Sequence, residues 1–201
     1  AIVGVIAAMT LPGLINKTNN TEYVIALKKS YEVLSQVVYK FRSENGSVQG
    51  ALSNATTNED LANIFIAKLN VKTNCGENNE YASGCMPDRY VSASSTSSHS
   101  TSGMSTIITN DGMSYGFANL NASCNATIPP DGCGRIFTDI NGPNKGPNLF
   151  GRDVFAFMLT KDGLYPLLLN GGAPTVIYSG PPSGANLVCA QKVLTEGAMN
   201  Y

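Results

Sequence analysis

The first 44 residues carry the clearest hydrophobic pattern in the chain. Between residues 21 and 44, apolar side chains recur at alternating steps of three and four, and most of the positions between them are polar or charged. This spacing lays one continuous apolar stripe along an α-helix and predicts that the stripe packs against another element. The stripe consists of Val24, Leu27, Tyr31, Leu34, Val38 and Phe41.

A shorter, almost purely apolar tract precedes this helix. The tract runs to Leu11. The pair Pro12-Gly13 follows it and predicts a break in the helix formed by residues 1–20. A helix needs about 20 apolar residues to cross a bilayer, so the tract as it stands is too short to span one. We predict that it is covered by something larger than a single copy of the chain. Its residues are Ala1, Ile2, Val3, Val5, Ile6, Met9 and Leu11, followed by Pro12 and Gly13.

Residues 45–201 are predicted to form a globular head. Thr57 is a helix cap ahead of apolar residues at helical spacing, which predicts a short second helix. The pair Asp111-Gly112 lies between two apolar runs and predicts a β-hairpin over residues 106–117.

Further strands are predicted at residues 135–140 and 154–160, with a short helix at residues 190–196. Residues 71–105 are predicted to be irregular, with a Ser/Thr-rich surface loop at their centre. Strands that follow each other this closely favour antiparallel pairing. The predicted fold class is therefore α+β, a long N-terminal α-helix whose half at residues 21–44 packs on a small antiparallel β-sheet head.

Composition narrows the classes of function. The net charge is −1 and only 13% of the residues are charged, so no basic surface is predicted to attract nucleic acid or anionic lipid. Asn, Ser, Thr and Gly take the place of the missing charged residues, and this composition favours a protein whose surface is exposed outside the cytoplasm.

The five cysteines predict disulfides. Cys75 and Cys85 lie close together in sequence, as do Cys124 and Cys133, and both pairs stand in turn-rich sequence without any metal-binding spacing. Two bridges in an oxidising compartment are predicted. Their connectivity stays open, because Cys189 could replace any of the other four.

The N-terminus resembles the type IV pilin-like family, which includes type IV pilins and the pseudopilins of type II secretion. The resemblance is carried by the apolar tract that ends at Pro12 and by the long helix with Tyr23, residues 28–31 and residues 34–36. Family members carry a leader, a methylated first residue and a glutamate near their start. None of these is present, so the sequence is expected to lack about the first third of a membrane-spanning helix. Later stretches that resemble a branch of the family are residues 139–142, 146–148, 151–155, 189–194 and 199–201.

The resemblance implies a structural subunit of a type IV pilus-like filament, or fimbrium, with no catalytic role. Such a subunit is held in the inner membrane before assembly, polymerises with copies of itself through its N-terminal helix, and displays its head for functions such as cell adhesion. The pilus assembly machinery is the implied further partner, and a cell-surface or extracellular filament is the implied location. The alternative within the family is a pseudopilin of a type II secretion or competence machine, which remains in the envelope. A remote alternative is an extracytoplasmic hydrolase or binding module.

Two motifs could carry chemistry. Residues 112–116 match the G-x-S-x-G nucleophile motif around Ser114, but they lie in a predicted hairpin, and the only histidine, His99, precedes them. No cofactor is predicted. A calcium site is the weaker alternative to Asx turns in the Gly/Pro-rich loop that follows residue 138. Its oxygen ligands would be Asp139, Asn141, Asn148 and Asp153.

Overall fold

The structure is a computed structural model that describes residues 2–77, 84–87, 89–92, 98–126, 132–167 and 189–199. In the first helix the side chains are described from Asn20 onward, and those of Ser92, Ser98 and His99 are not described. The helices are α1 (Ile2–Asn45), α2 (Val48–Ala51), α3 (Asn58–Ile66) and α4 (Cys189–Glu196). The strands are β1 (Val71–Glu77), β2 (Arg89–Ser92), β3 (Ser98–Ser100), β4 (Ser105–Thr109), β5 (Ser114–Ala118), β6 (Gly132–Asp139), β7 (Leu149–Phe150), β8 (Val154–Thr160) and β9 (Leu164–Pro166).

The described strands form one curled, mixed sheet in the order β1-β4-β5-β6-β8-β7-β2-β3, with β9 also paired to β8. The pairs at its centre are antiparallel, whereas β7 runs parallel to both β8 and β2. The predicted fold class, a helix packed on a small antiparallel sheet, is therefore wrong. The head is mostly β-structure in a large mixed sheet, and its other helices are short.

The error arose between residues 71 and 105, which were predicted to be irregular. This segment supplies β1, β2 and β3, whose sequences are polar and lack the alternation that marks a half-buried strand. The pairing of β1 with β4 is also interrupted by two register shifts, which removes any regular period from β1. These strands are specified by their partners in the sheet rather than by their own hydrophobic pattern.

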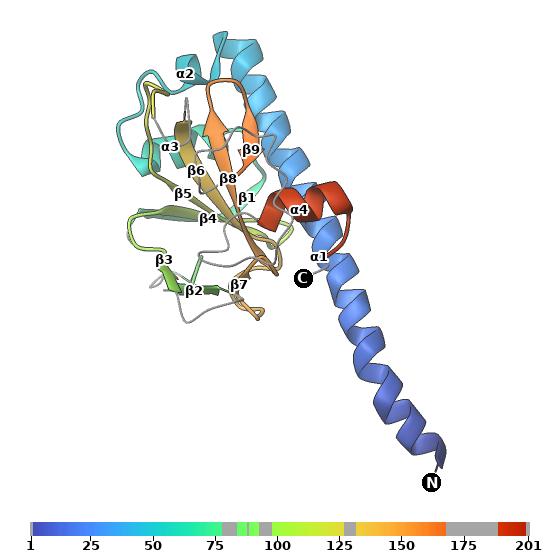
Figure 1. The fold of residues 1–201 in the computed structure, drawn as a ribbon. Coiled ribbons are helices and arrows are strands. Elements are labelled where there is room, and N and C mark those ends of the chain that lie inside the picture. The colour runs from blue at the N-terminus through green and yellow to red at the C-terminus, as the bar shows by residue number, and fades with distance from the viewer. Residues whose placement is uncertain are drawn as a thin grey trace.

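Helix α1 is a single helix of 44 residues, about 66 Å long at 1.5 Å per residue. The backbone stays helical through Pro12 and Gly13, so the predicted break is wrong. A proline removes only one backbone donor, and the neighbouring turns can carry the helix past it. In Figure 1 the C-terminal half of α1 lies along the head, and its N-terminal half projects away from it.

Two smaller elements were predicted correctly. The side chain of Thr57 accepts a hydrogen bond from the Asp60 amide, and Asp60 in turn accepts one from the Thr57 amide, so α3 begins with the predicted cap. Strands β4 and β5 form the predicted hairpin, and Gly112 at its turn has a φ of 87°, a conformation that favours glycine. Helix α2 was not predicted, because residues 45–56 carry no extended apolar stripe.

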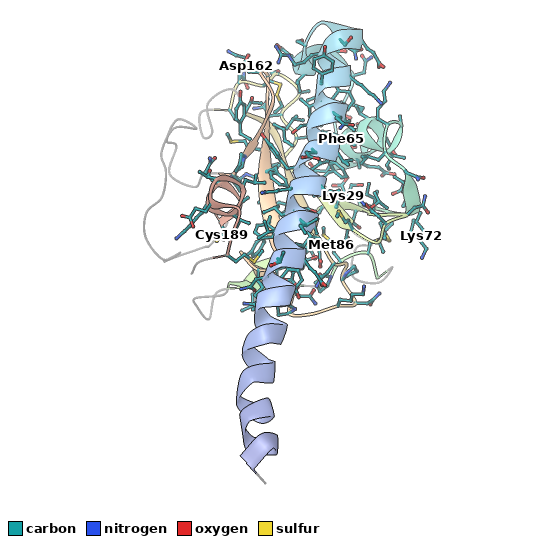
Figure 2. The ribbon with its side chains drawn as sticks, turned by 90° about the vertical axis from the view of Figure 1, so that its right-hand side faces the viewer. Lys29, Phe65, Lys72, Met86, Asp162 and Cys189 are labelled. Atoms are coloured by element: carbon teal, nitrogen blue, oxygen red, sulfur yellow. A yellow bond between two sulfur atoms is a disulfide. The ribbon has the colours of Figure 1, made fainter. Side chains whose placement is uncertain are left out.

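The main core lies between α1, α3, α4 and one face of the sheet (Figure 2). Aromatic rings link these layers, since Phe41 of α1 lies 5.0 Å from Phe65 of α3, which lies 5.1 Å from Phe117 of β5. A second buried cluster includes Tyr90, Phe137 and Phe150 and joins β2 and β7 to the central strands.

Leu34 tests the packing of α1, because its side chain is fully buried in the main core. We expect Leu34→Asp to lower the free energy of unfolding by about 3 kcal/mol or more, since the site offers an unpaired carboxylate no compensation for lost hydration. Urea denaturation followed by circular dichroism measures the change.

Gln36→Asp is the matched control, because Gln36 is exposed on the same helix. It introduces the same carboxylate and should change stability by less than about 0.5 kcal/mol. Equal effects of the two substitutions would contradict the burial of this helix face.

Candidate functional site

The C-terminal half of α1 is fixed to the head by the predicted stripe. Within the stripe, Tyr31 is half-buried and the other side chains are buried. Tyr31 bridges two strands, because its ring lies 5.5 Å from that of Phe157 in β8 and its hydroxyl donates to the Leu164 carbonyl of β9 over 3.2 Å. The buried members are Val24, Leu27, Leu34, Val38 and Phe41.

Polar contacts that the apolar pattern could not indicate add to this attachment. Ser30 is fully buried, and its hydroxyl donates to Thr138 Oγ1 of β6 over 3.1 Å. Lys29 forms a 2.8 Å ion pair with Asp111 in the β4–β5 turn. A serine and a lysine beside an apolar stripe look like ordinary polar-face residues, so only the tertiary structure identifies these contacts.

The N-terminal half of α1 leaves the head, as both views show (Figures 1 and 2). The predicted assembly residues from Ile2 to Gly13 lie in this projecting part, where the structure describes the backbone but not the side chains. Ala1 lies outside the described residues. The structure therefore places the apolar tract on a helix that extends beyond the head.

A groove of about 530 Å³ lies where α1 meets the segment that follows α4. One face of α1 and residues 197–199 form its walls, with Val24 and Met199 among the apolar lining. Lys28 also lines the groove and takes part in no ion pair among the described residues. We refer to this feature as the α1 groove.

Two large apolar side chains on the outer face of α1 are exposed. Ile25 is 63% exposed at the α1 groove, and Tyr39 is 72% exposed near the other end of the helix. Single exposed apolar side chains are common on protein surfaces.

The four candidate calcium ligands come together in the loop between β6 and β8, which we call the acidic loop (residues 139–153). Asp139 and Asp153 are both fully buried. Asp153 accepts hydrogen bonds from the Asn148 and Leu149 amides at 2.8 and 2.7 Å, and Asn141 donates to it over 3.4 Å. The side chains therefore hold the loop in shape.

Asp139 is tied to the loop and to β2. Its Oδ1 accepts from the Gly142 amide over 2.9 Å, and its Oδ2 accepts from the Tyr90 hydroxyl over 3.1 Å. Burial, and then the nearby charge of Asp153, raise the pKa of Asp139 to about 7, despite these hydrogen bonds. Burial also raises the pKa of Asp153.

The acidic loop is better suited to hydrogen bonding than to holding a metal. Its carboxylate oxygens already accept from backbone amides and from Tyr90, which leaves few lone pairs for a cation. No group of three or more acidic, histidine or cysteine side chains suited to a metal ion occurs among the residues that the structure describes. The hydrogen bonds to Asp139 and Asp153 order this loop, and Asn141 Oδ1 is the one buried side-chain oxygen of the four candidate ligands that has no hydrogen-bond partner among the described residues.

Ser114 lies within strand β5, not at the strand-to-helix turn that the nucleophile motif requires. Its side chain is fully buried, and its hydroxyl donates to the Cys85 carbonyl. The side chain of His99 lies outside the described residues. At this position the hydroxyl serves as a structural donor and is not accessible to a substrate.

Two disulfides form between neighbours in sequence, Cys75–Cys85 and Cys124–Cys133. The disulfides that the sequence predicted are thus confirmed, and the structure settles a connectivity that the sequence left open. Cys189 is buried at the start of α4, where burial raises the pKa of its thiol to about 11. Two bridges hint at an oxidising, extracytoplasmic environment.

The predicted Ser/Thr-rich surface loop is described only at its two flanks, β2 and β3, which pair with each other. Residues 93–97 at its centre lie outside the described residues.

No protein-family model, no characterised protein and no solved structure matches the chain. Within the part of the chain that the structure describes, no helix combines the length and the apolar character needed to cross a membrane.

The buried acid pair predicts an unusual pH dependence of stability. A carboxyl group with a raised pKa in the folded state stabilises the fold when protonated, and this contribution is lost as the pH rises from about 4 to above 7. We expect the free energy of unfolding to fall by about 1–4 kcal/mol between pH 5 and pH 8, at 1.36 kcal/mol per unit of pKa. Asp139→Asn should remove most of this slope, because the amide stays neutral throughout.

Urea denaturation at pH 5 and pH 8 measures the slope, with Glu32→Gln on the exposed side of α1 as the matched control. The control should keep the slope of the parent protein. A slope that survives in Asp139→Asn would show that another group is responsible for it.

Proposed function

We propose that this protein is a structural subunit of a type IV pilus-like filament, which polymerises through its N-terminal helix and displays its head. One observation carries the proposal. A helix of 44 residues is fixed to the head by its C-terminal half, while its N-terminal half projects and bears an apolar sequence.

An apolar helix that projects from a head must be covered. Leaving its side chains in water costs roughly 25 cal/mol per Å² of apolar surface, so burial against other helices or lipid is strongly favoured. The tract carries no charge between Ala1 and Leu11 that would oppose such burial. Copies of the same helix are the simplest cover in a polymer of identical subunits.

A filament also follows from the asymmetry of the subunit. A projecting helix cannot pack on its own head, and its contact with the next copy uses different surfaces on the two partners. A heterologous contact of this kind generates a helical fibre when the rotation between successive copies does not close into a ring. Before assembly, we infer, the same tract anchors the subunit in the inner membrane with the head outside the cytoplasm, where the two disulfides would form.

The proposal assigns no catalytic step to the head. The one nucleophile motif is used for packing at Ser114. The function of the head would then be to cover the helix core of the fibre and to present its own surface.

Removal of the apolar tract tests the proposal. We expect the full chain to form fibres visible by negative-stain electron microscopy after detergent is removed, and a variant that lacks residues 1–11 to remain monomeric in analytical ultracentrifugation. Ile6→Asp should abolish fibres in the full-length chain, because a buried unpaired carboxylate is costly in a packed helix core.

Lys40→Glu is the matched control, since it changes a charge at an exposed position of α1 next to the head. It should leave fibre formation intact, and all variants should retain the circular dichroism of the folded head. Fibres from the chain without residues 1–11 would refute the role of the tract. Fibres micrometres long in the native cell would favour a pilus, and short stubs within the envelope would favour a pseudopilus.

A further inference from the structure

The chain contains Asn-Gly pairs, in which the backbone can attack the asparagine side chain. Glycine has no Cβ to shield its amide nitrogen, so this nitrogen can approach the side-chain carbonyl carbon of the preceding asparagine. The structure describes two such pairs, Asn45-Gly46 and Asn141-Gly142, and a third at residues 170–171 lies outside the described residues. The same dipeptide therefore occurs in two environments that can be compared directly.

The pair Asn45-Gly46 lies at the end of α1, and both residues are exposed. No hydrogen bond from the Gly46 amide is present among the described residues. The φ of Gly46 is 75°, and no atom beyond its neighbours in the chain lies within 4 Å of the place that a Cβ would occupy. The Asn45 side-chain amide donates a 3.2 Å hydrogen bond to the Phe41 carbonyl. Both reacting groups are thus exposed and only weakly held.

The pair Asn141-Gly142 lies in the acidic loop, where both reacting groups are held. The Gly142 amide donates to Asp139 Oδ1 over 2.9 Å, and the Asn141 side-chain amide donates to Asp153 Oδ2 over 3.4 Å. The backbone is also closely packed, because a Cβ added at Gly142 would lie 2.5 Å from the Gly112 carbonyl oxygen. Closing a ring between the two residues would require these contacts to break.

We propose that Asn45 is a self-modification site that deamidates through a cyclic imide in the folded protein, whereas Asn141 is protected by its loop. In this reaction the Gly46 nitrogen bonds to Cγ of Asn45 and the Cγ–Nδ2 bond breaks. Ammonia leaves together with the proton that the Gly46 amide gives up. Water then opens the cyclic imide at either of its two carbonyls, and the product is aspartate or isoaspartate. Water is the only other reactant.

The product changes the charge at the end of α1. The C-terminal end of a helix carries a partial negative charge, so a new carboxylate at position 45 is unfavourable there. Glu44, which pairs with Lys68 at 2.6 Å, places a further negative charge beside it. Deamidation therefore adds a negative charge to a chain of net charge −1 and weakens the last turn of α1. The inference goes beyond the proposed filament function and does not depend on it.

Peptide mapping by mass spectrometry tests the inference in the full-length chain incubated at pH 8. We expect the peptide with Asn45 to deamidate about tenfold faster than the peptide with Asn141, which corresponds to about 1.4 kcal/mol in activation free energy. Isoaspartate should form together with aspartate at position 45, because a cyclic imide opens in both directions. In concentrated urea with the disulfides reduced, the two rates should agree to within about threefold, since both pairs then lose their native contacts.

Asn45→Gln and Gly46→Ala are the matched variants. Glutamine would have to close a larger ring, and a Cβ at position 46 shields the amide. Each should slow modification at position 45 by about tenfold and leave the rate at Asn141 unchanged. Asn45→Gln keeps an amide at this exposed position, so it should fold even if Gly46→Ala is destabilised by the positive φ.

Three results would overturn the inference. The first is equal deamidation of Asn45 and Asn141 in the folded protein, and the second is a difference in rate that survives in urea. The third is a folded protein in which Asn45 stays unmodified while the unfolded chain reacts. None of these measurements requires fibres, so their outcome is separate from that of the filament proposal.

Discussion

The structure depends on the burial of one face of α1 against the sheet. Leu27 and Leu34 are fully buried there, and Tyr31 reaches across to β8 and β9. A short helix in water is marginally stable by itself, so the packing of this face contributes most of the stability of the C-terminal half. The same packing sets the direction in which the other half leaves the head (Figure 1). Attachment and projection are therefore two consequences of one apolar stripe.

The sheet is held together by a different kind of constraint. The acidic loop carries the chain from β6 through β7, which runs parallel to β8, and then into β8. The buried carboxylates of Asp139 and Asp153 order this loop by accepting hydrogen bonds from backbone amides. Tyr90 ties β2 to the same cluster through Asp139. Burying two acids together is costly, which explains why the pKa of Asp139 is raised. The mixed part of the sheet thus depends on polar groups that no hydrophobic pattern reveals.

The proposed function depends more on the burial of one face of α1 than on the acidic loop. The head is fixed to one half of a long helix. The way in which the projecting half packs in an assembly would therefore determine where the head lies. The α1 groove lies near the point where the attached part of α1 ends, with Lys28 in its wall.

Elements whose signals are local could be predicted from the sequence. The stripe from Val24 to Phe41, the cap at Thr57 and the turn at Gly112 each depend on neighbours within a few residues, and each lies in the expected element. The extent and mixed pairing of the sheet could not be predicted in this way, because the polar strands β1–β3 are stabilised by distant partners. The tertiary structure also decided the two disulfide pairings and the α1 groove, since these depend on which segments meet in space, and local spacing carries no record of such contacts.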